Sequence, residues 1–364
     1  MQKPRVLILG GCGFIGRNLV SYLVQEELTS AIRIVDKVPP QVAWLNKVHQ
    51  DYLNNPIVEF RSANLINSDS CKNAFSSDAS WDFVVNCAGE TKGSQTDPIY
   101  NEGILKLSLN CANESAQGNV KHYVELSCGN MSSSEKVPHT EDGPMEPWTN
   151  VAKFKAKVEK ELKDVPGLKF TVLRLPTVYG SGDRGSMVQR IMVAGIYRKL
   201  GETMKLLWNA GYKVNTVHVE DVCRAIWFVL NRDDTIGEIY NVVDDSNSTQ
   251  GSISELLQEL FDIKIDYYGV MLSAMVDLTN AADEANDKHM DPWAKACRQD
   301  DVQNTPLSPH MDAEVLLNKH LNIDGTKLKN LGFELKYPNL NAQVLKNIMN
   351  EFVEMKVYPA SLAP

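Results

Sequence analysis

The 364-residue sequence lacks any hydrophobic run long enough to cross a membrane. A membrane-spanning helix needs about 20 mostly apolar residues, whereas the apolar run at residues 5–9 is followed at once by glycines. That run is also too short for the hydrophobic segment of a secretory signal. We therefore expect a cytoplasmic protein without a membrane span.

The sequence also lacks paired cysteines. Its seven cysteines are an odd number, are scattered, and include no C-x-x-C pair: Cys12, Cys71, Cys87, Cys111, Cys128, Cys223 and Cys297. Secreted disulfide scaffolds and zinc sites both need closely spaced sets of cysteines. We therefore expect neither disulfides nor a metal site, and a reducing compartment.

Positive charge is in deficit as well. The 37 lysines and arginines face 46 aspartates and glutamates, which gives a net charge of −9. Binding to a nucleic-acid backbone requires a basic surface, so we expect no nucleic-acid partner. A local basic pocket for a small phosphorylated ligand is not excluded by this balance. The hydrophobic content of 43% is ordinary for a globular protein with a large core.

A glycine-rich turn near the N-terminus predicts a dinucleotide-binding unit. Residues 5–9 form a short apolar run typical of a strand buried on both faces of a parallel sheet. Gly10, Gly13 and Gly16 follow, and residues 18–24 then have a helical pattern. Such glycines permit a tight turn, a close approach to a pyrophosphate, and packing of the helix on the sheet. The helix N-terminus then offers free N–H groups to the phosphates.

The next apolar run, residues 32–36, predicts a second strand that ends in a carboxylate, Asp36. A carboxylate at this place accepts hydrogen bonds from the adenosine ribose hydroxyls and repels a 2′-phosphate. Asp36 therefore favours NAD(H) over NADP(H), although Lys37 beside it is a positive charge.

The ordered set of segments resembles the extended short-chain dehydrogenase/reductase family, which includes nucleotide-sugar epimerases and dehydratases and 3β-hydroxysteroid dehydrogenases. The G-x-x-G-x-x-G spacing, the N-C-A-G turn at 86–89, and R-x-x-x-V-Y-G at 174–180 carry the resemblance over residues 3–245. It implies an α/β fold: a Rossmann-like doubly wound parallel sheet with a smaller C-terminal substrate lobe. Residues 1–180 would form the NAD-binding domain, with returning segments near 212–245, and residues 181–364 the discontinuous lobe.

The resemblance also implies the cofactor and the residues that contact it. The cofactor would be NAD. Its expected contacts are Gly10, Gly13, Phe14, Ile15, Gly16, Asp36, Lys37, Asn64, Leu65, Cys87, Ala88, Gly89, Lys155, Pro176 and Val178.

One catalytic residue of the family pattern is missing. The family uses a tyrosine as proton donor or acceptor, and a lysine four residues later favours the phenolate. Alignment of that pattern places Lys155 on the lysine and Val151 on the tyrosine. The upstream serine position falls on Cys128, with Ser127 one residue earlier. An isopropyl group cannot carry a proton, so we expect NAD binding with lost or altered catalysis.

Three interpretations stay open at this point. In the first, a pseudoenzyme binds cofactor without redox chemistry. In the second, an active oxidoreductase or epimerase uses another group, and the available residues are Tyr179, Lys153, Cys128 and His218. Each of these four is also explained by a structural role: a pocket wall, a solvated lysine, a small buried thiol and a packed histidine. In the third, the alignment register is wrong.

The same resemblance suggests ligands and partners. An active protein would act on a nucleotide-sugar or steroid-like alcohol, whereas an inactive one would serve as a structural or regulatory subunit of a larger assembly. A homodimer would form through helices at 99–116 and 150–162. In the lobe, Arg190, Arg198 and Lys199 could meet a phosphorylated or carboxylated substrate, but a solvated helix face is the favoured interpretation.

One segment, residues 267–299, does not follow the family pattern. Its helical spacing is expected to end before Pro292. The polar and aromatic residues near that end would cap the substrate pocket, bind a partner, or form a helix end and loop; they are Asn286, Asp287, His289 and Trp293.

Overall fold

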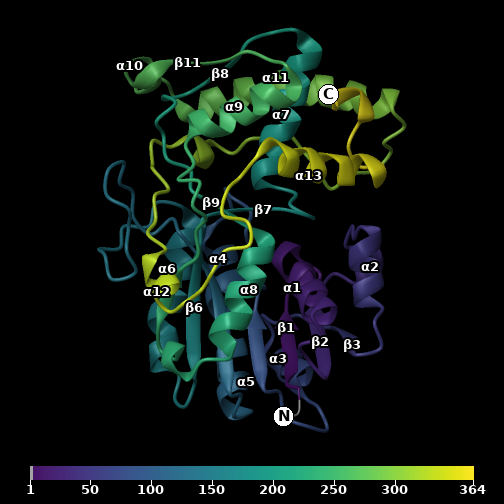
Figure 1. Ribbon diagram of the computed structural model, residues 1–364, viewed down its shortest axis with the longest axis vertical. Coiled ribbons are helices and arrows are strands. Elements are labelled where there is room, and N and C mark those ends of the chain that lie inside the picture. The colour runs from purple at the N-terminus through teal and green to yellow at the C-terminus, as the bar shows by residue number, and fades with distance from the viewer. Residues whose placement is uncertain (1–2) are drawn as a thin grey trace.

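The fold is built on one seven-stranded parallel sheet (Figure 1). The structure is a computed structural model that describes residues 3–364. Every neighbouring pair of strands is parallel. The spatial order is β3 (Val58–Ser62), β2 (Ala31–Asp36), β1 (Arg5–Leu9), β4 (Phe83–Asn86), β5 (His122–Cys128), β6 (Phe170–Leu175) and β10 (Ile239–Asn241). The order reverses direction beside β1, which confirms the predicted doubly wound sheet and sets its ligand crevice at that edge.

Helices cover both faces of the sheet because its strands are apolar on both sides. On β1, Val6 and Ile8 join one core and Leu7 and Leu9 join the other. The first core is completed by α1 (Phe14–Gln25) and α8 (Val219–Leu230), with α2 (Lys47–Leu53) packed on α1. The second core is completed by α3 (Ser68–Phe75), α5 (Leu107–Gln117) and α6 (Asn150–Glu161). Between β4 and α5 the chain forms α4 (Asp97–Tyr100) and a π-helical stretch, Asn101–Lys106.

A second group of helices lies above the carboxyl ends of the strands (Figure 1). It has its own apolar core, to which α7, α9, α11 and α13 all contribute. Their bounds are α7 (Ser186–Leu200), α9 (Gln250–Phe261), α11 (Leu278–Gln299) and α13 (Ala342–Glu354). The smaller elements are β7 (Thr177–Tyr179), β8 (Met204–Leu206), β9 (Thr216–His218), β11 (Ile265–Tyr267), α10 (Gly269–Ser273) and α12 (Thr326–Asn330). Short 3-10 turns lie at Pro40–Val42, Leu162–Asp164, Asp233–Thr235, Ala313–Leu316 and Ala360–Leu362.

The expected helix end before Pro292 is wrong. Helix α11 runs through Pro292 to Gln299. Proline removes one backbone hydrogen bond of a helix, but buried side chains on both sides of it, His289 and Trp293, hold the helix against the lobe. Tertiary packing therefore overrides the local signal.

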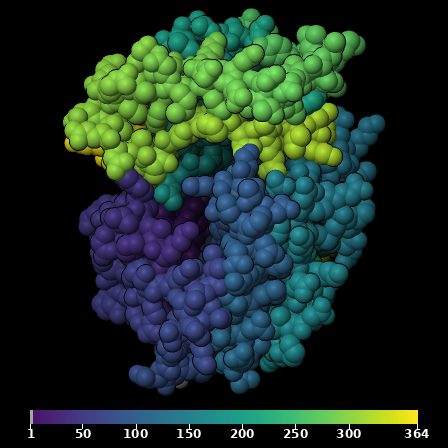
Figure 2. All heavy atoms as spheres, turned by 180° about the vertical axis from the view of Figure 1, so that it is seen from behind, coloured from purple at the N-terminus to yellow at the C-terminus, as the bar shows by residue number. Residues whose placement is uncertain are grey.

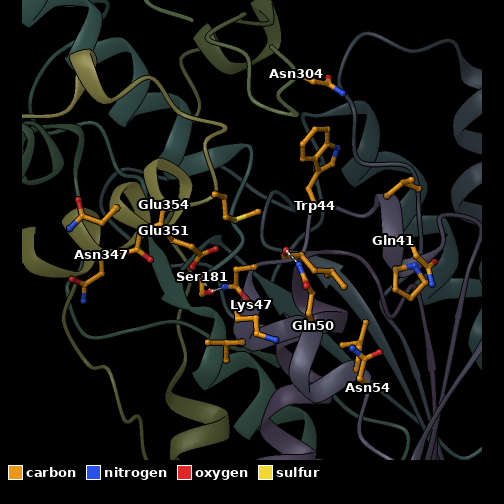
Figure 3. Close-up of a pocket in the computed structure, with 18 residues that line it drawn as sticks. Gln41, Trp44, Lys47, Gln50, Asn54, Ser181, Asn304, Asn347, Glu351 and Glu354 are labelled. Carbon is orange, nitrogen blue, oxygen red and sulfur yellow. Dashed lines mark hydrogen bonds between the residues drawn. The ribbon is translucent and has the colours of Figure 1, made fainter. Parts of the chain in front are cut away.

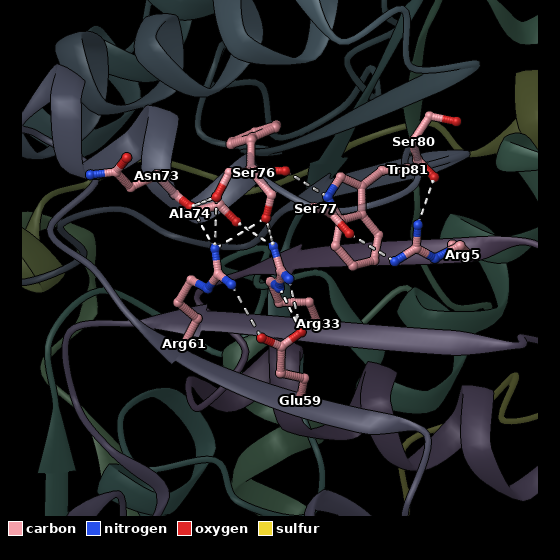
Figure 4. A network of polar contacts seen from close by, with 11 residues as sticks. Arg5, Arg33, Glu59, Arg61, Asn73, Ala74, Ser76, Ser77, Ser80 and Trp81 are labelled. Carbon is pink, nitrogen blue, oxygen red and sulfur yellow. Dashed lines mark hydrogen bonds and ion pairs between the residues drawn. The ribbon is translucent and has the colours of Figure 1, made fainter.

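An arginine buried in the sheet secures the far edge of the nucleotide-binding half (Figure 4). Arg33 on β2 donates to Glu59 on β3 at 2.9 Å and to the carbonyl of Ser76, after α3, at 2.6 Å. The guanidinium also lies over the ring of Trp81. Because a buried cation is stable only when paired and hydrogen-bonded, this network fixes α3 against β2 and β3.

Within residues 3–364, no helix is both long and apolar enough to span a membrane.

Candidate functional site

The glycine turn joins β1 to α1 with no room for side chains. Gly10 has φ +76°, and a Cβ atom on it would lie 2.7 Å from the backbone nitrogen of Ala88. A Cβ on Gly16 would lie 2.3 Å from the carbonyl oxygen of Gly10. Gly13 is the N-cap residue of α1 and offers no side-chain cap, and the first turn of the helix has no acidic residue. The turn therefore leaves the helix N-terminus open to an anion.

Asp36 lies at the end of β2 against this turn. Its Oδ2 accepts a hydrogen bond from the backbone N–H of Cys12 at 3.1 Å, and its Oδ1 accepts from Val38 N–H at 3.0 Å. The carboxylate is partly exposed, whereas Lys37 beside it is exposed. Asp36 is thus close enough to the turn to meet a ribose that extends from a bound pyrophosphate.

Arg17 holds the glycine turn in place through hydrogen bonds from the protein interior. Its guanidinium donates to the carbonyls of Cys12 at 2.6 Å, Ala43 at 2.8 Å and Trp44 at 2.9 Å. Burial lowers the pKa of Arg17 to about 10. Arg17 could not be recognised from the sequence, because its carbonyl partners come together only in the folded chain.

The other expected cofactor residues follow the carboxyl ends of the strands. The turn after β4 lies between the glycine turn and Lys155. Ala88 adjoins Gly10, and a Cβ on Gly89 would be 3.7 Å from the Nζ of Lys155. Leu65 is buried and Asn64 is exposed after β3. Cys87, Pro176 and Val178 follow β4 and β6, while Phe14 and Ile15 occupy the first turn of α1.

Lys155 is held by a buried carboxylate, Glu125, which was not among the residues predicted from the sequence. Its Nζ lies 3.0 Å from Glu125 Oε1 and 2.7 Å from the carbonyl of Leu126. Glu125 is fully buried on β5. It also accepts hydrogen bonds from the hydroxyl of Tyr123 at 2.6 Å and from Asn86 Nδ2 at 2.8 Å. The sequence signal that could have identified Glu125 is its charge inside the strand-like segment 122–128.

Val151 lies in the first turn of α6, where its side chain packs partly buried against the α6-side core. Ser127 donates to Glu159 Oε1 at 2.6 Å, and Glu159 forms a buried ion pair with Arg174 at 2.7 Å. Ser127 therefore belongs to a structural network. Burial raises the pKa of the Cys128 thiol to about 11, so Cys128 is a thiol rather than a thiolate at neutral pH.

The other residues considered as proton carriers have structural surroundings. Tyr179 is buried and packs edge-on against His218, and burial raises its pKa far above the ordinary value. His218 caps α8 by accepting from Glu220 N–H, stacks on Tyr337, and has its pKa lowered to about 4 by burial. Lys153 is exposed.

A cavity of about 290 Å³ opens where β5 and β6 end. Asn130 and Thr177, which follow these strands, line it together with Arg190 of α7. Burial lowers the pKa of Arg190. Among residues 3–364 its guanidinium has no ion pair. Three aromatic side chains also line the cavity: Trp148, Trp208 and Tyr212.

Arg190 thus corrects the expectation of a solvated helix face. Arg198 and Lys199 agree with that expectation, since both are exposed at the end of α7. Arg198 donates to the carbonyl of Ala363, and Lys199 donates to Gln299.

A segment far along the chain closes this cavity. Glu314, on the turn Ala313–Leu316, accepts a hydrogen bond from the backbone N–H of Asn150 at 2.8 Å. Of the residues that the structure describes, it is the only carboxylate that lines the cavity. The carboxylate therefore satisfies one free N–H at the start of α6, the helix that carries Val151 and Lys155.

Seen from behind, the molecule is hollowed between the upper lobe and the N-terminal half (Figure 2). A larger cavity lies between residues 40–54 and α13 (Figure 3). Its volume is about 1480 Å³, and none of its lining residues belongs to the glycine turn. Elsewhere in the described part of the chain, no three acidic, histidine or cysteine side chains come together as a metal site.

Comparisons with known proteins agree with this geometry. The model of the NAD dependent epimerase/dehydratase family matches residues 6–242. Among solved structures, UDP-N-acetylglucosamine 4-epimerase from Methanobrevibacter ruminantium M1, in complex with UDP-N-acetylmuramic acid, aligns with a TM-score of 0.68 and 19% identity, over 97% of this chain and 99% of that chain.

Two further structures show the same fold. UDP-glucose 4-epimerase from Thermus thermophilus, in complex with NAD, has a TM-score of 0.64 and 20% identity over 94% of this chain and 98% of that one. dTDP-glucose 4,6-dehydratase from Bacillus anthracis str. Ames, in complex with NAD, has a TM-score of 0.69 and 18% identity over 96% of this chain and 97% of that one. A search of curated proteins gave no match.

Proposed function

Because the chain belongs to the NAD dependent epimerase/dehydratase family, we propose that it binds NAD(H) and a nucleotide-sugar but does not carry out the family's tyrosine-dependent proton transfer. The observation that carries the proposal is the contact between Lys155 Nζ and Glu125 Oε1 at 3.0 Å. Lys155 lies on α6, where the family pattern aligned on this lysine would put its tyrosine at Val151.

The cofactor half of the proposal rests on the turn and on Asp36. The open N-terminus of α1 would hold the pyrophosphate through backbone N–H groups. Gly10 and Gly16 keep that space free of side chains. Asp36 would accept the ribose hydroxyls and would repel the extra phosphate of NADP(H). When bound, NAD supplies hydride transfer; the residues of the chain supply binding and orientation.

The proposed absence of proton transfer rests on three residues. Val151 has no proton to give or accept. Lys155 is tied to a carboxylate, so its positive charge is offset where the family pattern uses it to favour a phenolate. Cys128, with its pKa raised to about 11, cannot replace the phenolate as a base at neutral pH.

The ligand half rests on Arg190. The guanidinium of Arg190 is half-buried and has no carboxylate partner among residues 3–364. It favours an anionic ligand, because a charge withdrawn from water is costly until it is paired. Lys213 and Lys319 line the same cavity. A nucleotide-sugar has the required phosphates, and solved structures of similar fold contain UDP-glucose or UDP-N-acetylmuramic acid. A steroid-like ligand has no group to match these cations.

An active enzyme with another acid or base is the second candidate, and one observation favours it. Glu314 is a carboxylate on the cavity wall that contacts the start of α6. In that case a bound sugar alcohol would give its proton to Glu314, and Glu314→Gln would abolish turnover without lowering sugar affinity.

Thermal unfolding with NAD+, NADH, NADP+ and NADPH tests the binding half. A ligand at about 100 times its Kd stabilises the fold by about 2.7 kcal/mol. We expect stabilisation by NAD+ and NADH and little by the phosphorylated pair. Equal stabilisation by all four would contradict the role given to Asp36, and none by any would contradict NAD binding.

A further inference from the structure

The cavity of about 1480 Å³ is separate from the two binding places described above. It shares no lining residue with the cavity of Arg190 and none with residues 10–16. One wall is formed by residues 40–54, and the opposite wall by α13. Ser181 and Asn304 complete it, and Figure 3 shows these side chains around Trp44.

Side-chain amides dominate its polar surface. Seven line the cavity: Gln41, Asn46, Gln50, Asn54, Asn304, Asn347 and Asn350. Each amide offers both donors and an acceptor. Four of them, Gln41, Asn54, Asn304 and Asn350, are exposed, and their side chains form no hydrogen bond within residues 3–364. The wall therefore presents uncommitted hydrogen-bonding groups of both kinds.

The charges of this cavity do not suit an anion. Among the described residues its one cation is Lys47, which is paired with Asp51 at 2.5 Å on the surface of α2. Two carboxylates, Glu351 and Glu354, lie on the α13 wall. Glu351 accepts from Ser181 Oγ at 2.5 Å, whereas Glu354 is exposed and has no ion pair in the described chain. Phosphates and nucleotides would meet net repulsion here.

Trp44 gives the cavity an aromatic surface in a fixed position. Its backbone has φ +56°, its carbonyl accepts from Arg17, and its side chain packs partly buried against the core of the upper lobe. An indole held in this way offers a flat apolar face beside polar groups.

We propose that this cavity binds a neutral oligosaccharide. Sugar hydroxyls both donate and accept hydrogen bonds, as the amides and carboxylates require, and the C–H face of a pyranose packs on an indole. The volume exceeds that of a usual small-molecule pocket, about 300–1,000 Å³, so it has room for more than one sugar unit. The proposal does not depend on the presence of NAD.

Saturation-transfer NMR and calorimetry on the full chain, with a panel of neutral trisaccharides of gluco, galacto, manno and N-acetylglucosamine type, test it. We expect at least one to bind, and Asn350→Ala or Glu354→Ala to weaken binding about fivefold, the loss of one hydrogen bond. Both side chains are exposed, so neither change should unfold the protein. Asn330→Ala, an exposed asparagine on α12, is the matched control and should bind as wild type does.

Three results would overturn the proposal. The first is no binding by any member of the panel at millimolar concentration. The second is binding that Asn350→Ala and Glu354→Ala leave unchanged. The third is binding that Arg190→Gln abolishes, since the sugar would then occupy the other cavity.

Discussion

Lys155 and Glu125 form a buried ion pair, with Nζ and Oε1 3.0 Å apart, directly behind the turn that follows β4. The pair joins α6 to the middle of the sheet, and Tyr123 and Asn86 complete the hydrogen bonds of the carboxylate. Two of the three donors of this ammonium thereby have partners inside the fold, Glu125 and the carbonyl of Leu126.

Glu125→Gln should lower the free energy of unfolding by about 3 kcal/mol, because removal of one partner leaves an uncompensated buried charge. Urea unfolding at neutral pH measures this loss. The matched control is Glu102→Gln, since Glu102 forms an exposed pair with Lys106 at 2.7 Å; it should cost less than about 1 kcal/mol. If the two changes lowered the free energy of unfolding equally, Lys155 would not be left as an uncompensated buried charge, and the prediction would be contradicted.

Gly16→Ala should abolish NAD binding and cost about 2 kcal/mol of stability, because a Cβ there would lie 2.3 Å from the carbonyl of Gly10. Calorimetric titration with NAD+ and urea unfolding check the two effects. Gly185→Ala is the control, since a Cβ at Gly185 meets no atom within 4 Å. Normal NAD affinity in Gly16→Ala would contradict the assignment of the turn.

The turn and Asp36 could be predicted from the sequence because their signals are local: an apolar run, spaced glycines and a carboxylate at a strand end. The contacts on which the proposed loss of proton transfer rests are not local. Glu125 meets Lys155 across 30 residues and Glu314 meets Asn150 across 164. Nor could the spacing of residues 267–299 show that packing of Trp293 carries α11 past Pro292.

Arg190→Gln should weaken binding of UDP and UDP-glucose about tenfold or more, as expected for loss of a charged hydrogen bond. Isothermal titration measures it. Arg198→Gln on the same helix, exposed and bonded to a backbone carbonyl, should leave the affinity unchanged. If both variants bind the nucleotide as wild type does, the phosphate site lies elsewhere.

His289→Leu should make stability less dependent on pH. Burial lowers the pKa of His289 to about 4, and neither ring nitrogen has a hydrogen-bond partner among the described residues. The unfolded chain takes up the proton near pH 6.5 and the folded chain does not. The stability that neutral His289 contributes to the fold is therefore complete above pH 6.5 and is lost as pH falls toward 4.

Wild type should accordingly lose about 2 kcal/mol more than His289→Leu between pH 7 and pH 5. Urea unfolding at the two pH values measures the difference. His310→Leu, which changes an exposed histidine, should keep the wild-type dependence. Parallel pH profiles of wild type and His289→Leu would contradict the burial of a neutral ring.

The most direct test of the central claim is a turnover measurement on the wild-type chain saturated with NAD+. Purified protein is mixed with UDP-glucose, UDP-N-acetylglucosamine and dTDP-glucose, the sugars are followed by proton NMR, and bound NADH is followed by its near-ultraviolet absorbance. We predict that NAD+ binds in one-to-one ratio while no sugar is converted and no NADH accumulates. Conversion of any of these sugars at a rate that Lys155→Met abolishes would contradict the account.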